Sequence, residues 1–506
     1  MNVFPYKLFR DALKELEKDT FEEIYFSENS IVDIYLHCLK ETKSIVLEKL
    51  FLYSEANQDE TQIKEGIDSN IIHKKRKMDL PRPKNTSNES QPNTTKKTEY
   101  NSESQTTKSR KKENQDIFCV NGSVPELLEF VKDYSESKIS SQTYTTVNKN
   151  WFFIYSNSRI LNSLFFLFGD GWKCTINYYN GHTENIYNKE TSLLALNVLN
   201  ILDLTVIVAG APEWRLEFCQ KMIETIESIF SLNPKLSFLD TNNTTIPTNE
   251  YPIIRNPLKQ YENQISLQEF SNLIQDEFCE PFIIKNATNH WPAFSKNNSW
   301  NNLEYLCSAV GYYRLVPIEI GNNYTESTWS QKLVYFSEYL EDCILSKSNN
   351  KTSYLAQHNL FKQSRKLSND FNIPDYCYTD AKCFERCKNK FNSCCGNVED
   401  VIINAWIGPK NTVTPLHYDT FHNLFCQVAG YKYVKLLSHK FSSQVYPYDP
   451  STMLSNTSQV DAEFPNLEKH SEFCSLPFLE CILSPGDLLY IPPKYWHYLR
   501  SLSVST

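Results

Sequence analysis

Three features that would assign the chain to a common class are missing from its sequence. The start, MNVFPYKLFRDALKELEK, has no apolar core of the kind that a signal peptide requires. We therefore expect no secretion and reduced thiols among the 15 cysteines. A surplus of lysine and arginine is missing too, because the formal charge is −9. DNA and RNA binders need such a surplus to neutralise phosphate, so we expect no direct nucleic-acid binding.

An uninterrupted membrane-spanning run is also missing. The most apolar stretch, 193–211, contains Asn197, Asn200 and Asp203 and has no basic flank. Polar side chains of this kind are costly in hydrocarbon, so the stretch predicts a buried helix and no membrane contact. No dedicated histone-reading module is visible in the sequence either.

The composition divides the 506 residues into four parts. Helical periodicity predicts an N-terminal helical segment over 1–56 and a helical domain over 117–237, which pack together. Residues 57–116 are rich in Asn, Ser, Thr, Lys and Glu and have almost no aromatic residues, which predicts a disordered insert. Short apolar runs between turns over 238–506 predict a double-stranded β-helix, or jelly roll. The expected fold class is therefore α+β.

The insert carries two basic runs, 73–77 and 108–112, separated by a spacer with two prolines. Exposed clusters of this kind are used as nuclear localisation signals, while a solvated charged linker is the simpler alternative. We expect the protein in the nucleus, with the cytoplasm as a second location.

The most informative stretch is VIINAWIGPKNTVTPLHYDTFHNLFCQVAGYKYVKL, residues 401–436, centred on His417-Tyr418-Asp419. In a strand, side chains alternate between faces, so His417 and Asp419 project to the same side. A second histidine, His497, lies in the later segment SPGDLLYIPPKYWHYL. Two histidines and a carboxylate on one face of an octahedral ion are the ligands of non-haem Fe(II) oxygenases. A lone His-x-Asp is weak by itself, because most histidines are structural.

A lysine strengthens the prediction. Lys432 shares strand parity with the apolar residues Val434 and Leu436, so its ammonium is expected on an apolar face. A buried lysine without an anion is costly, and an anionic ligand explains it most simply. The alternative is a lysine that extends to solvent at a sheet edge.

Several motifs carry a family resemblance. The segments NAWIGPKNTVTPLHYD, GYKYVKL, YPYD, SQVD and SPGDLLYIPPKYWHY resemble the JmjC family of Fe(II)- and 2-oxoglutarate-dependent oxygenases. Upstream, PFIIKNATNHWP, VPIEIGNNYTESTWSQ, YLAQHNLF and IPDYC also match in the same order. The resemblance spans 251–500 and implies a cupin-like JmjC fold for this part of the chain. It further implies that His417, Asp419 and His497 hold Fe(II), and that 2-oxoglutarate and O₂ are consumed.

The resemblance also assigns the remaining site residues. Lys432 would pair with the distal carboxylate of 2-oxoglutarate, helped by Tyr324, Thr414 and Asn423. The strand parity does not place Thr414 on the metal face, so its role rests on the resemblance alone. Trp406 would line the substrate side of the pocket, where a core tryptophan is the alternative.

The subgroup that the motifs resemble is associated with two reactions on a protein or peptide substrate. Hydroxylation of a side-chain methylene leaves the hydroxyl in place, whereas hydroxylation of an N-methyl group releases formaldehyde and demethylates lysine. We favour hydroxylation of an arginyl residue, because a flat guanidinium stacks on Trp406. Histone lysine demethylation is the first alternative, and an inactive cupin-like binding module is the second.

Two features depart from the family pattern. Five cysteines crowd an apparent insertion between Cys377 and Cys395, with spacing unlike the usual zinc knuckle, so free thiols compete with a zinc site. The sequence given ends at Thr506, before a further aromatic stretch of the family's last strand. We expect a short terminal strand that leaves a barrel edge unpaired.

Overall fold

The structure is a computed structural model that describes most of the helical and β-rich parts of the chain. The described residues are 6–19, 29–57, 122–143, 146–169, 189–230, 251–276, 278–321, 324–325, 328–345, 353–379 and 401–506. Both basic runs of the insert, and the cysteines from Cys383 to Cys395, lie outside these residues. The predictions for them therefore stay predictions.

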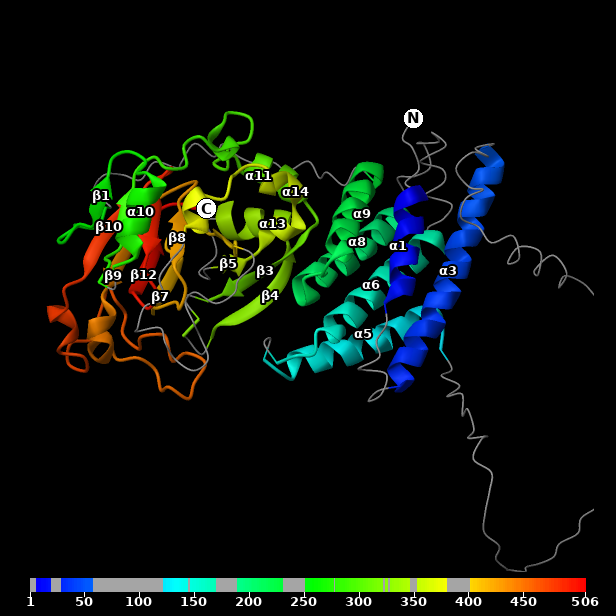
Figure 1. Ribbon diagram of the computed structural model, residues 1–506, viewed down its shortest axis with the longest axis horizontal. Coiled ribbons are helices and arrows are strands. Elements are labelled where there is room, and N and C mark those ends of the chain that lie inside the picture. Colours follow the sequence, from blue (N-terminus) through cyan, green and yellow to red (C-terminus); the bar gives the residue numbers. More distant parts are fainter. Residues whose placement is uncertain are drawn as a thin grey trace, which may run out of the picture.

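Within the described residues, six helices form the N-terminal part of the molecule, and Figure 1 shows them on one side of the β-rich domain. They are α1 (Tyr6–Lys18), α3 (Asn29–Asn57), α5 (Val124–Ser140), α6 (Asn150–Phe168), α8 (Lys189–Ala209) and α9 (Trp214–Phe230). Helix α6 lies at the centre, in contact with α3, α5 and α8, and is buried on nearly every side. Some of its polar side chains bond to neighbouring helices, as Arg159 Nη1 does by donating to Glu129 Oε1 at 3.0 Å, and its buried serines bond to carbonyls of α6 itself. The helices before and after the insert thus share one core.

Helix α8 is the predicted buried helix. By length and composition alone, Ser192–Ala209 would suffice to cross a bilayer. In this fold the helix packs against α6 and α9 and buries Val198, Leu199 and Leu202 completely. Its polar residues Asn200 and Asp203 contact the β-rich domain.

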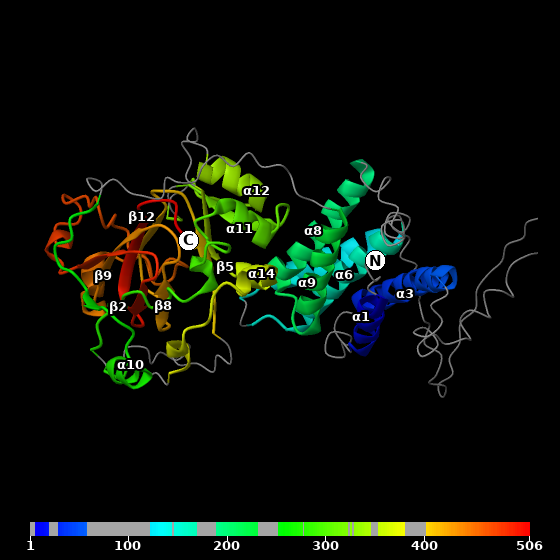
Figure 2. The same ribbon diagram turned by 90° about the horizontal axis from the view of Figure 1, so that it is seen from above.

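In the described residues, the β-rich domain contains three four-stranded sheets, and Figure 2 shows it beside the helical part of the molecule. The first has the order β10-β9-β12-β7, the second β1-β2-β11-β8 and the third β4-β3-β5-β6. The strands are β1 (Lys259–Tyr261), β2 (Phe282–Ile284), β3 (Leu315–Ile320), β4 (Ser330–Tyr335), β5 (Ser353–His358), β6 (Ala405–Ile407), β7 (Val413–His417), β8 (Asn423–Cys426), β9 (Lys432–Leu437), β10 (Leu479–Leu483), β11 (Leu488–Ile491) and β12 (Trp496–Ser501). One apolar core joins the first two sheets, with Val434 and Leu436 packed against Leu489 and Ile491. The predicted α+β class with a C-terminal double-stranded β-helix is confirmed.

Short helices flank these sheets. They are α10 (Leu267–Ile274), η3 (Pro292–Phe294), α11 (Leu303–Val310), α12 (Phe336–Glu338), η4 (Tyr339–Leu345), α13 (Leu360–Gln363), α14 (Arg365–Ser368), η5 (Asp375–Tyr378), η7 (His439–Val445) and η8 (Phe473–Ser475). Helix α10 begins at Ser266, whose hydroxyl accepts from the backbone N–H of Glu269, and α11 begins in the same way at Asn302.

The expectation of an unpaired edge at the C-terminal end is wrong. Strand β12 pairs with β9 on one side and β7 on the other, and residues 502–506 continue as a paired tail. Ser505 forms an antiparallel bridge with Gly408, and Thr506 exchanges backbone hydrogen bonds with Ala429. The tail passes so close to Gly430 that a Cβ there would lie 1.9 Å from the Val504 carbonyl oxygen. With its φ of +71°, this position favours glycine strongly.

Candidate active site

The predicted metal ligands meet where β7 and β12 pair. His417 is the last residue of β7, His497 is the second of β12, and the antiparallel register sets them opposite each other. Asp419 follows β7 by two residues, and its carboxylate lies 4.0 Å from His417 Nε2 and 3.6 Å from His497 Nε2. One ligand atom from each of the three residues falls within 4.8 Å of the others. Tyr418 turns away and packs against Trp496.

Both imidazoles are oriented for metal binding. Nδ1 of His417 lies 2.8 Å from the Pro415 carbonyl, and Nδ1 of His497 lies 3.0 Å from the Tyr495 carbonyl. A carbonyl only accepts hydrogen bonds, so each Nδ1 carries a proton and donates it, and Nε2 is the ring nitrogen left to bind an ion next to Asp419. Burial, with His497 beside it, lowers the pKa of His417 to about 4, so this imidazole is neutral at pH 7. The donor set therefore fits an ion such as Fe(II).

Lys432, the first residue of β9, lies in the interior with only 1% of its surface exposed. Its ammonium donates to the Tyr354 hydroxyl at 3.0 Å and lies 5.2 Å from the centre of the Phe425 ring. No carboxylate of the described residues lies within ion-pair distance of it, and burial lowers its pKa to about 7. Val434 and Leu436 belong to one apolar core and Tyr433 and Leu437 to another, so the side chains of β9 alternate between two faces as predicted. An anionic ligand would remove the cost of this cation.

The three polar residues that were expected to help Lys432 fall into two groups. Thr414 hydrogen-bonds to the same Tyr354 hydroxyl that Lys432 contacts, so it lies at the lysine end of the pocket. Asn423 donates to Asp419 Oδ2 at 2.7 Å and thus fixes the carboxylate at the metal end. Tyr324 also lies toward that end.

The position of Tyr324 near the metal ligands follows from its contact with Thr457. Its hydroxyl lies 3.5 Å from Thr457 Oγ1, and Thr457 forms a bridge with His417. Burial raises the pKa of Tyr324 to about 12, and the Asp419 charge acts in the same direction. The phenol is therefore a neutral hydrogen-bonding group beside the metal ligands at physiological pH.

Trp406 lies on β6 and is half-buried, with its ring 6.3 Å from that of Phe425. Since Phe425 also contacts Lys432, the tryptophan belongs to the wall of the same interior. Its expected contact with substrate stays a prediction.

Sequence reasoning missed two residues of this interior, Tyr354 and Glu319. They face each other across the pairing of β3 with β5. Val316 and Ile318 of β3 point into an apolar core, so the alternation turns Glu319 toward the opposite face. Burial raises the pKa of Glu319, and the neighbouring Trp329 indole acts against this shift. The alternation in VPIEI separates Glu319 from the apolar face but does not show that its own face lines the interior, so the sequence carried no clear signal for this residue.

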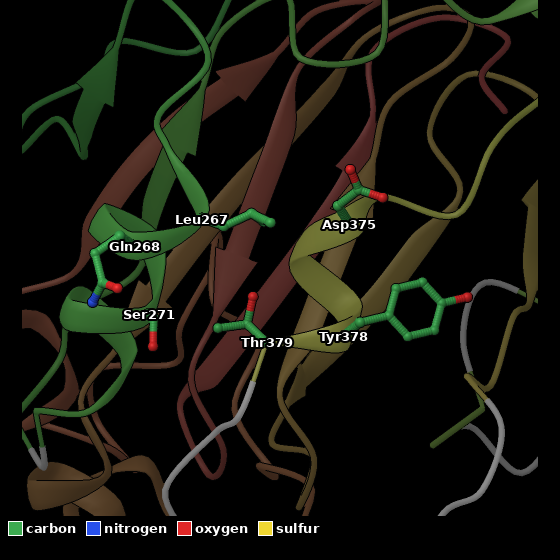
Figure 3. A pocket seen from close by; sticks show the side chains of 6 residues that line it. All are labelled: Leu267, Gln268, Ser271, Asp375, Tyr378 and Thr379. Carbon is green, nitrogen blue, oxygen red and sulfur yellow. The ribbon is translucent and has the colours of Figure 1, made fainter.

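A separate pocket of about 390 Å³ opens at the surface between α10 and η5 (Figure 3). Its lining residues are Leu267, Gln268, Ser271, Asp375, Tyr378 and Thr379. None of them is a predicted site residue, and they offer no metal-binding set. The pocket therefore contains none of the three predicted metal ligands.

Comparison with known proteins covers both parts of the chain. The family model described as a cupin-like domain matches residues 267–506. JmjC domain-containing protein D of Dictyostelium discoideum is 44% identical over 266 residues, which are 51% of this chain and 57% of that protein. Lysine-specific demethylase 8 of Danio rerio is 35% identical over 383 residues, 75% of this chain and 85% of that protein.

Lysine-specific demethylase JMJ30 of Arabidopsis thaliana is 44% identical over 226 residues, 44% of this chain and 48% of that protein. The chain thus spans about half the length of two of these three relatives. The similarity to the Danio rerio protein covers more of the chain than the cupin-like match does, and so extends beyond the β-rich domain.

Proposed function

The chain belongs to the JmjC family of cupin-like, 2-oxoglutarate-dependent oxygenases, and we propose that it hydroxylates an arginyl residue of a protein or peptide substrate. The reaction would convert 2-oxoglutarate and O₂ into succinate and CO₂. The observation that carries the chemistry is the combination of a His-Asp-His set with a buried ammonium inside one barrel.

The residues at one end of the pocket would bind the metal, and Lys432 at the other end would bind 2-oxoglutarate. Fe(II) held by His417, Asp419 and His497 would supply the redox chemistry that couples 2-oxoglutarate decarboxylation to O₂ activation. Lys432 binds the distal carboxylate of 2-oxoglutarate through a charge-assisted hydrogen bond. Asn423 keeps the Asp419 carboxylate in place by donating to Oδ2.

Three further side chains shape the lysine end. The hydroxyls of Tyr354 and Thr414 interact with each other beside Lys432 Nζ. Both can donate a hydrogen bond to the distal carboxylate of 2-oxoglutarate. The Phe425 ring covers the ammonium and excludes water, which strengthens the ion pair that forms there.

Support for an arginyl substrate comes from Glu319. Its half-buried carboxylate shares the interior with Tyr324 and Tyr354. A guanidinium offers five N–H donors in one plane, whereas a methylated ammonium has fewer to give to a carboxylate. The carboxylate of Glu319 therefore favours an arginyl substrate over a methylated lysine.

Lysine demethylation is the second candidate, and the relatives favour it. The proteins from Danio rerio and Arabidopsis thaliana carry the name of lysine-specific demethylases. An inactive binding module is disfavoured, because all three metal ligands and the lysine are present in this sequence.

The test has two stages. Succinate release from 2-oxoglutarate should be abolished by His417→Ala and by Asp419→Ala, while His290→Ala, at an exposed histidine of the same domain, should leave it unchanged. Mass spectrometry of arginine-containing and methyl-lysine peptides then identifies the product. A gain of one oxygen on arginine supports the proposal, and loss of a methyl group with equimolar formaldehyde supports demethylation. Undiminished turnover by His417→Ala would refute both.

We also propose that the basic runs direct the protein to the nucleus. A fluorescent fusion that lacks residues 72–112 should lose nuclear enrichment. An equal distribution with and without the segment would show that it is a linker.

A further inference from the structure

The helical region and the β-rich domain meet through a buried cluster of charges. Asp203 of α8 is fully buried, and both of its carboxylate oxygens accept hydrogen bonds from the β-rich domain. Arg314 donates to Oδ1 from Nη2 at 2.7 Å, and the backbone N–H of Leu315 donates to Oδ2 at 2.9 Å. Gln363 Nε2 donates to Oδ1 at 2.9 Å. One helix thus supplies the acceptor for three groups of the other domain.

The groups that donate hydrogen bonds to Asp203 are connected to the ends of two strands. Leu315 is the first residue of β3. Gln363 also donates to the Leu315 carbonyl at 3.0 Å, and its oxygen contacts Nε2 of His358, the last residue of β5. The carboxylate therefore connects directly to the start of β3 and, through one amide, to the end of β5.

These two strands lead into the active site. They pair antiparallel, and Glu319 of β3 lies opposite Tyr354 of β5. Tyr354 is the residue whose hydroxyl contacts Lys432, and Glu319 is the carboxylate beside Tyr354. The cluster thus lies at one end of the strand pair, and the pocket residues lie toward the other.

Other contacts surround the cluster on the same face of the helical region. Asn200 donates to the Tyr335 hydroxyl of β4 at 3.1 Å, and Gln220 of α9 donates to the Lys362 carbonyl at 2.7 Å. Glu227 of α9 approaches Gly311 so closely that a Cβ there would lie 2.2 Å from its carboxylate. Figures 1 and 2 both show α8 and α9 between the other helices and the β-sheets.

We propose that Asp203 is a positioning residue for the oxygenase, through which the helical region fixes β3 and β5 and with them the 2-oxoglutarate pocket. Without its carboxylate, the buried guanidinium of Arg314 loses its charge partner, the N–H at the start of β3 loses its acceptor, and the strand pair loses its fixed end. The helical region is then part of the active enzyme rather than a separate module. This inference rests on the proposed function for its kinetic test, though not for its structural test.

The experiment compares full-length wild type with Asp203→Asn, in which the side chain keeps its size and loses its charge. Hydrogen–deuterium exchange should become about tenfold faster in residues 315–320 and 353–358 and stay unchanged in 432–437 and 496–501. In succinate assays, the apparent KM for 2-oxoglutarate should rise about tenfold, while kcat changes less than twofold.

A matched control separates positioning from general loss of stability. Glu129→Gln removes the carboxylate that pairs with another buried arginine, Arg159, inside the helical region. This variant should lower the melting temperature without changing exchange in β3 and β5 or the KM. If both variants raise KM equally, or if Asp203→Asn leaves exchange in β3 and β5 unchanged, the proposal is wrong.

A second variant covers the case in which Asp203→Asn fails to fold. Asp203→Leu combined with Arg314→Met removes the carboxylate and the cation together, so neither member of this ion pair is left buried alone. This protein should fold and still show faster exchange in both strands and a raised KM. Wild-type exchange in this variant would overturn the proposal. Absence of turnover in the wild type would refute the proposed function alone, because exchange still reports on the strands.

Discussion

Two buried cations of the β-rich domain differ in what surrounds them. Arg314 is 2% exposed and donates to both oxygens of Asp203, whereas Lys432 is 1% exposed and its ammonium contacts the phenol of Tyr354 and the ring of Phe425. Burial alone would lower the pKa of Arg314, but the Asp203 charge raises it. At Lys432 burial acts alone and lowers the pKa to about 7. The carboxylate of Asp203 offsets the desolvation cost of Arg314 within the fold, whereas we infer that an anionic ligand does so for Lys432.

The strongest test of this comparison removes each cation in turn. Arg314→Met should lower the free energy of unfolding by about 3–5 kcal/mol, because Asp203 is left as an uncompensated buried charge. Lys432→Met should raise it by on the order of 2–4 kcal/mol in the absence of ligand, because the desolvation cost of the ammonium disappears. Urea denaturation at pH 7 measures both.

The signs of these two changes decide the outcome. Loss of stability in Lys432→Met would mean that the ammonium has a structural partner, and the contrast with Arg314 would fail. Lys432→Arg is the control, since it keeps the charge and should not show the gain.

The next effect concerns affinity. Lys432→Met should weaken 2-oxoglutarate binding about 100-fold, because loss of one partner from a desolvated charge pair costs about 2–5 kcal/mol. Binding is measured by calorimetry with Zn²⁺ as a redox-inert ion. 2-Oxopentanoate has the same chain length without the distal carboxylate, so its affinity should not fall. Equal losses for the two acids would place the distal carboxylate elsewhere.

The pH dependence of binding sharpens the same point. Below pH 7 the free protein already carries the proton on Lys432, whereas above pH 7 it must take one up to pair with the carboxylate. Affinity for 2-oxoglutarate should therefore be constant just below pH 7 and fall by up to about tenfold per pH unit above it. In Lys432→Arg, affinity should be flat between pH 7 and 9, because arginine stays charged. A flat profile in the wild type would contradict the lowered pKa.

The smallest effect is expected at the hydroxyl beside the ammonium. Tyr354→Phe removes the hydrogen bond from Lys432 Nζ and keeps the ring, which should change 2-oxoglutarate affinity by about 0.5–1.5 kcal/mol, or roughly 2–10-fold. Calorimetry at pH 7 detects this. Tyr378→Phe, at an exposed tyrosine of η5, is the control and should have no effect. A 100-fold loss in Tyr354→Phe would mean that the phenol, rather than Lys432, dominates binding.

Much of the site was predictable because its signals are local. The His-x-Asp spacing and the parity of Lys432 with Val434 and Leu436 follow from the period of a strand, and the structure brings these side chains to the interior. The order of motifs indicated the family. The two ends of the pocket could not be told apart in this way, so Asn423 was expected at the lysine end and lies at Asp419.

The remainder depends on contacts between distant residues. Asp203 and Arg314 are 111 positions apart, and each one alone looks like an ordinary polar residue beside an apolar run. The paired C-terminal tail was missed for a similar reason. Its partners at Gly408 and Ala429 are backbone groups, which any sequence offers, so composition gave no sign of them.

The pairing of His417 with His497 across β7 and β12 makes ligand geometry a measure of strand alignment. The two residues lie 80 positions apart along the chain, and only one register sets them opposite each other. A shift of β12 by a single residue would turn His497 to the other face and leave two ligands in place of three. A misaligned chain would thus be compact and yet bind metal poorly. Metal affinity measured during refolding would therefore distinguish molecules with the native register of β7 and β12 from molecules with a shifted register.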